Sequence, residues 1–182
     1  MSAGLPASDP SPDRARAVLV SRPVSSPNGA HETSLLTWWR RLSALPGGRA
    51  LFSLVLGFGV PYSGTTGATV LELAAGHARL AMRDRRGVRN HLNSIHAIAL
   101  ANLGEFASGL AMTCALPTDV RGIVTGLEVA YLKKARGRLT AESRSNLPAI
   151  AGVVEHHVVT EIRDAANDVV ARVTTRWRLE RR

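Results

Sequence analysis

The sequence predicts an α+β fold in which an antiparallel sheet wraps around one long central helix. Two observations predict it. An apolar stretch without proline runs from about Ser94 to Cys114, and strand-like alternation dominates the chain after Pro117. The chain has 182 residues, of which 45% are hydrophobic, so it can form one domain with a sizeable core. We therefore expect the sheet to bury one face against this helix.

The N-terminal part is predicted to be a tail followed by a helical extension. Residues 1–30 are rich in Pro, Ser, Gly and Ala, and such a composition cannot bury enough apolar surface to order itself. Thr33 or Ser34 then caps a predicted extra helix over residues 35–42, which Pro46-Gly47-Gly48 ends. A second apolar segment follows at residues 49–58. We expect a disordered tail over 1–30 and a single domain over 31–182.

Five or six strands are predicted around the central helix. Two lie at about residues 68–74 and 77–84 and are joined at Ala75-Gly76. The stretch 123–132 is apolar on both faces, which is typical of a central strand. Further strands are predicted from 139, over 153–162 and over 169–179, the last with the clearest alternation of apolar and polar residues.

The net charge of +9 arises from Lys and Arg residues that are spread along the chain in separate clusters. Aromatic residues make up only 4%, which argues against a stacking surface for single-stranded nucleic acid. No run of about eighteen apolar residues is present, and the N-terminus lacks the pattern of a secretion signal. We expect a cytoplasmic protein with no nucleic-acid partner and no membrane span.

The cysteine and histidine patterns argue against a metal centre. The single cysteine, Cys114, lies in an apolar context and is expected to be a core thiol. His156 and His157 are adjacent in a predicted strand, so they point to opposite faces and cannot chelate one metal ion. The Gly-rich turn at residues 63–67 lacks the Gly-Lys-Ser/Thr ending of a phosphate loop. We expect no metal and no cofactor.

Three polar residues stand near the start and the middle of the central helix: Asn90, His96 and Glu105. An acid is expensive to bury in such an apolar helix unless it is paired or used. His96 and Glu105 are nine residues apart. That spacing amounts to half a turn around a helix and about 13 Å along its axis. One helix cannot direct both side chains at one point, so either they act separately or a second copy supplies the missing partner.

The spacing of these residues resembles the hotdog-fold acyl-thioester hydrolases of the phenylacetate-pathway and 4-hydroxybenzoyl-CoA type. In that family an amide residue stands six positions before a histidine, and an acid stands nine positions after it, as Asn90, His96 and Glu105 do here. Downstream, residues 127–137 are similar to the strand and basic turn that meet the pantetheine and phosphates of coenzyme A. The similarity covers about residues 50–180 and looks most like a bacterial branch of the superfamily. Ala97 stands where the family has glycine.

The resemblance implies an acyl-CoA thioesterase of the hotdog fold that acts as a homodimer or a dimer of dimers. Glu105 is then the general base or the nucleophile, and the Ala97 N–H at the helix N-terminus holds the developing oxyanion. Asn90 orients the thioester or the water, and His96 shapes the oxyanion site. The substrate-binding residues implied are the cations of the basic turn and one hydroxyl: Lys133, Lys134, Arg136, Arg138 and Ser108.

Each of these residues also has a structural interpretation. Glu105 is then a buried acid that Asn102 or Ser108 satisfies, His96 caps its own helix, and Asn90 is a turn residue. The alternative function is a non-catalytic acyl-CoA binding module, which Ala97-Ile98 in place of the family's two glycines suggests.

Overall fold

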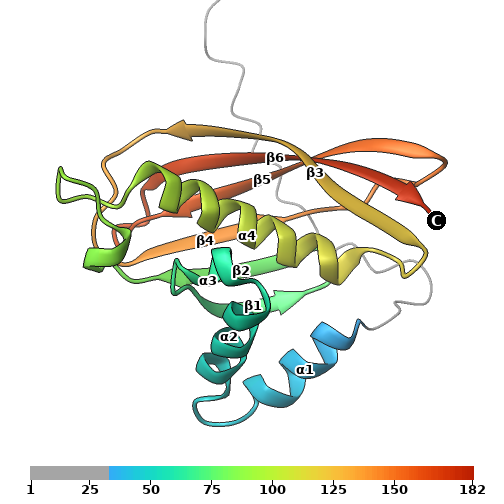
Figure 1. The fold of residues 1–182 in the computed structure, drawn as a ribbon, viewed down its shortest axis with the longest axis horizontal. Helices are drawn as coiled ribbons and strands as arrows, with labels where there is room; N and C mark the ends of the chain where they lie inside the picture. The colour runs from blue at the N-terminus through green and yellow to red at the C-terminus, as the bar shows by residue number, and fades with distance from the viewer. Residues whose placement is uncertain (1–32) are drawn as a thin grey trace, which may run out of the picture. The chain divides into compact units, whose positions relative to one another are not determined.

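A computed structural model describes residues 33–182 and has the predicted α+β architecture (Figure 1). Helix α4 (Ala97–Ala115) packs against one six-stranded antiparallel sheet of order β1-β2-β4-β5-β6-β3. The strands are β1 (Thr69–Ala74), β2 (His77–Met82), β3 (Val120–Tyr131), β4 (Leu139–Arg144), β5 (Val153–Arg163) and β6 (Val169–Arg181). The tail expected at 1–30 lies outside the described residues, so the domain division stays a prediction.

Within residues 33–182, three helices precede the sheet: α1 (Ser34–Ser43), α2 (Gly48–Gly59) and the short α3 (Pro61–Gly64). Thr33 caps α1, because its hydroxyl accepts a hydrogen bond from the Leu36 N–H at 3.4 Å. Trp39 of α1 and Phe52 of α2 pack edge to face, with ring centroids 5.1 Å apart. Helix α2 also packs on β1, so the extension covers the β1 edge of the sheet (Figure 1).

The core lies between α4 and the inner face of the sheet. From Ala171 onward, alternation along β6 buries one side and leaves the other more exposed, as the sequence predicted. The buried side consists of Ala171, Val173, Thr175, Trp177 and Leu179. Helix and sheet approach most closely at Gly104, where an added Cβ would lie 2.4 Å from Val173 Cγ2. Only a residue without a side chain fits at that contact.

Helix α4 begins at Ala97 and not at Ser94, which corrects the predicted boundary. The segment before it is held in an extended form, because the Ile95 N–H donates to Ala135 O at 2.9 Å and Ile95 forms a β-bridge with Arg89. His96 is the N-cap, since its Nδ1 accepts a hydrogen bond from the Ile98 N–H at 3.1 Å. The helix start is therefore fixed by a contact with a distant part of the chain.

Strand β3 lies at the edge of the sheet, whereas its two-sided apolar pattern predicted a central strand. Within the described part of the chain it pairs with β6 alone. Ile123, Leu127 and Tyr131 are 44%, 45% and 49% exposed. A long apolar edge strand offers unpaired backbone groups and apolar side chains to another chain. The apolar pattern of β3 is thus explained by an exposed edge and not by burial on both faces.

Helix α4 is long and apolar enough by composition to cross a membrane, with a mean hydropathy of 1.3 over 18 residues. However, 67% of that window is buried inside the fold. The apolar character of α4 therefore follows from its place as the core helix of the sheet.

Candidate active site

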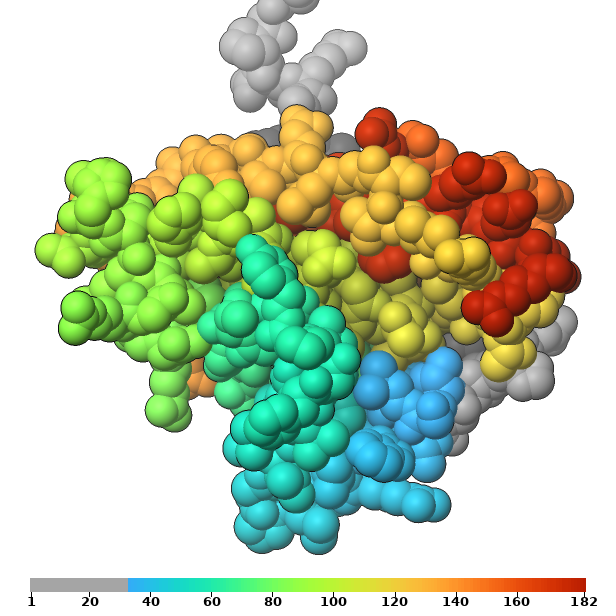
Figure 2. Space-filling view, viewed as in Figure 1, coloured from blue at the N-terminus to red at the C-terminus, as the bar shows by residue number. Residues whose placement is uncertain are grey.

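Glu105 lies on a face of α4 that the sheet does not cover. This open face of α4 consists of residues spaced by three or four, all half-buried or exposed: Ile98, Asn102, Glu105, Gly109 and Thr113. Part of α4 remains visible between the α2–α3 segment and β3 (Figure 2). The single acid of this helix therefore faces a surface that residues 33–182 leave partly open.

The Glu105 carboxylate is half-buried and has no hydrogen bond or ion pair among residues 33–182. The two neighbours expected to satisfy it, Asn102 and Ser108, bond to other groups. Asn102 Nδ2 donates to Tyr62 O at 3.2 Å, and Ser108 Oγ accepts from Trp177 Nε1 at 2.9 Å. Burial raises the pKa of Glu105 above the ordinary glutamate value. An unpaired, partly desolvated carboxylate has the properties of a general base or a nucleophile.

The start of α4 offers a backbone donor. The Ile98 N–H is taken by the His96 ring, whereas the Ala97 N–H has no partner within the described residues. Tyr131 Oη donates to Ala97 O at 3.1 Å and so ties β3 to this end of the helix. N–H groups in the first turn of a helix lack intrahelical acceptors and carry a partial positive charge. The Ala97 N–H is therefore suited to a negative oxygen.

Asn90 organises the loop that leads into α4. Its Oδ1 accepts hydrogen bonds from the Leu92 N–H at 2.9 Å, the Ser94 N–H at 3.2 Å and the Ser94 hydroxyl at 3.2 Å. The amide oxygen is thus committed to the turn, and the amide nitrogen is the part of the side chain left to donate to a ligand.

The structure does not bring the start of α4 and Glu105 together within one chain. His96 is the N-cap, and Glu105 lies nine positions later, about 13 Å along the helix axis. A cavity of about 190 Å³ adjoins the helix start, with Arg89, His96 and Ile98 among its lining residues, but Glu105 does not line it. The helix start and Glu105 are therefore two separate positions within the described chain.

The basic turn, residues 133–138, lies beside the start of α4. Ala135 O accepts the Ile95 N–H at 2.9 Å, and the Gly137 N–H donates to Asp84 Oδ2 at 2.9 Å. Asp84 also pairs with Arg89 at 2.6 Å, and these two contacts hold the pKa of Asp84 below its usual range. Residues far apart in the sequence thus place positive charge next to the helix N-terminus.

The cations of the basic turn have different surroundings. Lys133 Nζ lies 2.6 Å from Asp164 Oδ2 and 2.7 Å from Asp168 Oδ2, and hydrogen bonds to these carboxylates raise the pKa of Lys133. It joins the turn to the β5–β6 connection. Lys134, Arg136 and Arg138 are exposed, and none has a hydrogen bond or ion pair within the described chain. These three are the cations available to an anionic ligand.

Two other predicted groups lie inside the fold. Ser108 is 0% exposed and faces the sheet, so it does not reach the open face of α4 and has no place in the proposal below. Cys114 is the expected core thiol, and burial raises its pKa to about 11. No group of three His, Cys, Asp or Glu side chains is placed to hold a metal ion anywhere in residues 33–182.

The parts of the site that depend on tertiary contacts cannot be seen in the sequence. Asp84, which fixes the basic turn, and Tyr131, which holds the start of α4, are separated from their partners by many residues. The sequence does indicate an apolar face of α2, because Leu51, Leu54 and Phe58 are spaced by three or four in a segment with few polar residues.

Residues 48–179 match the family model of a domain of unknown function, DUF4442. This chain belongs to the DUF4442 family. A search of curated proteins gives no significant match.

Solved structures share the fold of this DUF4442 protein. A structural-genomics protein, APC5556, is 26% identical with a TM-score of 0.71, over 81% of this chain and 99% of that one. A Pseudomonas aeruginosa protein described as a probable thioesterase is 22% identical with a TM-score of 0.64, over 76% and 97%. A mutant of a Staphylococcus aureus thioesterase is 16% identical with a TM-score of 0.59, over 66% and 98%. The predicted hotdog fold is thereby confirmed.

Proposed function

We propose that this DUF4442 protein is an acyl-CoA thioesterase, which hydrolyses an acyl thioester to a free acid and coenzyme A in the cytoplasm. The observation that carries the proposal is the Glu105 carboxylate, which is half-buried and unpaired within the described chain and whose pKa is raised. A structural carboxylate at this depth would be expected to have a donor. Neighbours of the same fold that are described as thioesterases support the class of reaction.

The chemistry follows from the groups at hand. Glu105 takes a proton from water as the water oxygen attacks the thioester carbonyl carbon, or it attacks that carbon itself to form an anhydride that water then opens. The Ala97 N–H stabilises the oxyanion that forms. The Asn90 amide nitrogen orients the carbonyl or the water, and His96 holds the helix start in shape. Breaking of the C–S bond releases the coenzyme A thiolate, which takes up a proton.

The site is completed by a second copy of the chain. The two edges of the sheet differ: β1 has six residues and a bulge and packs against α2, whereas β3 has twelve residues and an exposed apolar row. Antiparallel pairing of two β3 strands about a two-fold axis makes the two α4 helices antiparallel as well. The start of one α4 then lies beside the middle of the other. We infer a homodimer, or a dimer of dimers, in which Glu105 acts with Ala97 of the other copy.

The basic turn binds the phosphates of coenzyme A. Lys134, Arg136 and Arg138 meet the phosphates by charge, while Lys133 fixes the turn through Asp164. Because the Ala135 carbonyl binds the segment just before α4, phosphates held here belong to a substrate whose thioester lies near a helix start. The basic turn and the N-terminus of α4 lie side by side, and this arrangement suits a long substrate with an anionic head group.

The alternative is a non-catalytic acyl-CoA binding module. Ile98 favours it, because its side chain is 55% exposed at the helix start and its N–H is already bonded to His96. A panel of acyl-CoAs with free-thiol detection separates the two functions when run beside calorimetric binding. We expect thiol release by the wild type and none above background by Glu105→Gln. Tight binding of every ester without thiol release would establish the binding module instead.

A further inference from the structure

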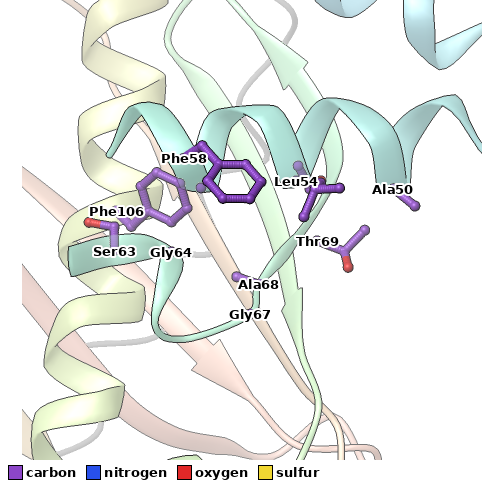
Figure 3. A pocket seen from close by; sticks show the side chains of 11 residues that line it. Ala50, Leu54, Phe58, Ser63, Gly64, Gly67, Ala68, Thr69 and Phe106 are labelled. Atoms are coloured by element: carbon purple, nitrogen blue, oxygen red, sulfur yellow. The ribbon is translucent and has the colours of Figure 1, made fainter. Parts of the chain in front are cut away.

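A second, larger cavity lies between α2, the segment from α3 to β1, and α4 (Figure 3). Its volume is about 340 Å³. Ala50, Leu54 and Phe58 line it from α2, and Phe106 lines it from α4. The two Phe side chains lie at the α3 end of the cavity and Ala50 lies at the opposite end, so the space runs along α2 (Figure 3).

Small residues keep this space open. Helices α2 and α3 touch backbone to backbone, because an added Cβ on Gly64 would lie 2.4 Å from Gly57 O. No side chain can enter the cavity from that contact. The small lining residues are Ala50, Gly57, Gly64, Gly67 and Ala68.

The chemistry of the lining favours an apolar occupant. None of the lining residues, all of which belong to the described chain, is charged. The Ser53 hydroxyl is already used, since it donates to Arg49 O at 2.7 Å and accepts the Val70 N–H at 2.8 Å. Leu54 and Phe58 are 58% and 77% exposed, so an apolar ligand would remove a large apolar area from water.

We propose that this cavity binds the acyl chain of the thioester, an inference that rests on the proposed function. Phe106 directly follows Glu105 on α4, so the aromatic end of the cavity adjoins the helical turn that carries the proposed catalytic acid. A chain seated along α2 contacts Leu54 but not Leu51, which does not line the cavity and is 50% exposed. A lipid surface or a protein partner covering α2 would contact both leucines.

The volume selects a class of acyl chain. At about 340 Å³ the cavity is at the low end of the roughly 300–1,000 Å³ that ligand pockets span, so it takes one short or medium straight chain. Each methylene that enters it should improve binding up to about fourfold, the ratio that corresponds to ~0.8 kcal/mol per buried CH₂. The gain should stop when the cavity is full.

The experiment uses S-alkyl coenzyme A thioethers of increasing chain length, which bind but cannot be hydrolysed. Affinity for the full chain is measured by calorimetry, beside hydrolysis of the matching acyl-CoAs. In the wild type we expect affinity to rise with chain length and then level off. Leu54→Trp, which fills the cavity, should make affinity nearly independent of chain length, and Leu54→Ala should move the plateau to longer chains. Leu51→Trp and Leu51→Ala are the matched controls and should behave as wild type.

The outcomes separate this inference from the proposed function. Graded thioether binding that only the Leu54 variants change, without thiol release from any acyl-CoA, would support the cavity and refute hydrolysis. Hydrolysis whose chain-length profile is the same in Leu54→Trp and Leu51→Trp would overturn the cavity assignment and leave the thioesterase intact. Equal loss of binding to phosphatidylcholine and phosphatidylglycerol vesicles in Leu54→Ala and Leu51→Ala, with unchanged thioether affinity, would also overturn it. Melting temperatures of all four variants confirm folding.

Discussion

Polar groups on the two faces of α4 differ in whether they have hydrogen-bond partners. On the face against the sheet, Ser108 accepts from Trp177 at 2.9 Å, and Gly104 O accepts from the Thr160 hydroxyl at 3.1 Å. On the open face of α4, the Glu105 carboxylate has no such partner within residues 33–182. Buried polar groups that serve the fold are normally satisfied. The contrast within one helix supports the proposal that Glu105 acts in catalysis, whereas Ser108 contributes to stability.

Removing one polar group from each face of α4 should give the largest difference between the two faces. Glu105→Gln should lower kcat for acyl-CoA hydrolysis by about 10²–10⁴-fold, the usual contribution of a general base. Ser108→Ala should leave kcat within a few-fold of wild type and lower the free energy of unfolding by about 1–3 kcal/mol, because Trp177 Nε1 loses its buried acceptor. Steady-state kinetics and urea unfolding measure both. If Ser108→Ala is as inactive as Glu105→Gln and as stable as the wild type, the proposed roles of Ser108 and Glu105 are contradicted.

Glycines on the two faces provide the next test. Gly104→Ala should cost about 1–3 kcal/mol of unfolding free energy, since the new Cβ would lie 2.4 Å from Val173. Gly109→Ala should raise the unfolding free energy by up to about 1 kcal/mol, because alanine favours the helix and its Cβ would meet only Glu105 Oε1 at 3.9 Å. Urea denaturation of the two variants shows whether each substitution raises or lowers the unfolding free energy. Equal destabilisation by both would show that the open face is as closely packed as the sheet face.

The cations of the basic turn should affect substrate binding and not the chemical step. Lys134→Glu combined with Arg136→Glu should raise KM for acyl-CoA about tenfold, or ~1.4 kcal/mol, with kcat little changed. Phosphate contacts remote from the carbonyl bind ground state and transition state alike. Lys133→Ala should change KM less, because Lys133 is already held by Asp164 and Asp168. A loss of kcat at constant KM in the double variant would contradict phosphate binding by this turn.

The smallest effect concerns the pKa of Glu105. Its ionised form is the active one, so kcat should fall as pH drops through a pKa that burial has raised. Gly109→Ser places a hydroxyl beside Glu105 Oε1, and a hydrogen bond to the charged form should lower that pKa and move the acid limb to lower pH. Gly109→Ala adds the carbon without the donor and serves as the control. A shift of the same size and direction in both variants would mean that the donor is not the cause.

Much of the fold was predictable because it depends on local patterns. The cap of α1 at Thr33, the long apolar run of α4 and the alternation along β6 all follow from residue spacing. The position of β3 was not predictable, since an apolar pattern on both faces is shared by central strands and by edges that meet another chain. The start of α4 was also missed, because it depends on the bond from Ile95 to Ala135.

In the candidate site, too, local features were predictable from the sequence and tertiary contacts were not. Asn90, His96 and Glu105 were predicted because their spacing resembles that of the hotdog thioesterases and all three lie on one short stretch of the chain. The spacing could not show that Ser108 faces Trp177, or that Lys133 is bound by carboxylates of the β5–β6 connection. Both partners are distant in sequence, and their contacts appear only when the strands are paired.

The most direct test of the central claim is complementation between two inactive variants. If Glu105 acts with the helix start of another copy, Glu105→Ala and His96→Ala should each be inactive or severely weakened while still forming dimers. Subunit exchange should then give half mixed dimers, each with one intact site and one doubly damaged site, so activity should recover to about a quarter of wild type. A mixture that stays as inactive as its parents, despite exchange proven by mass spectrometry of tagged subunits, would contradict a site shared between copies.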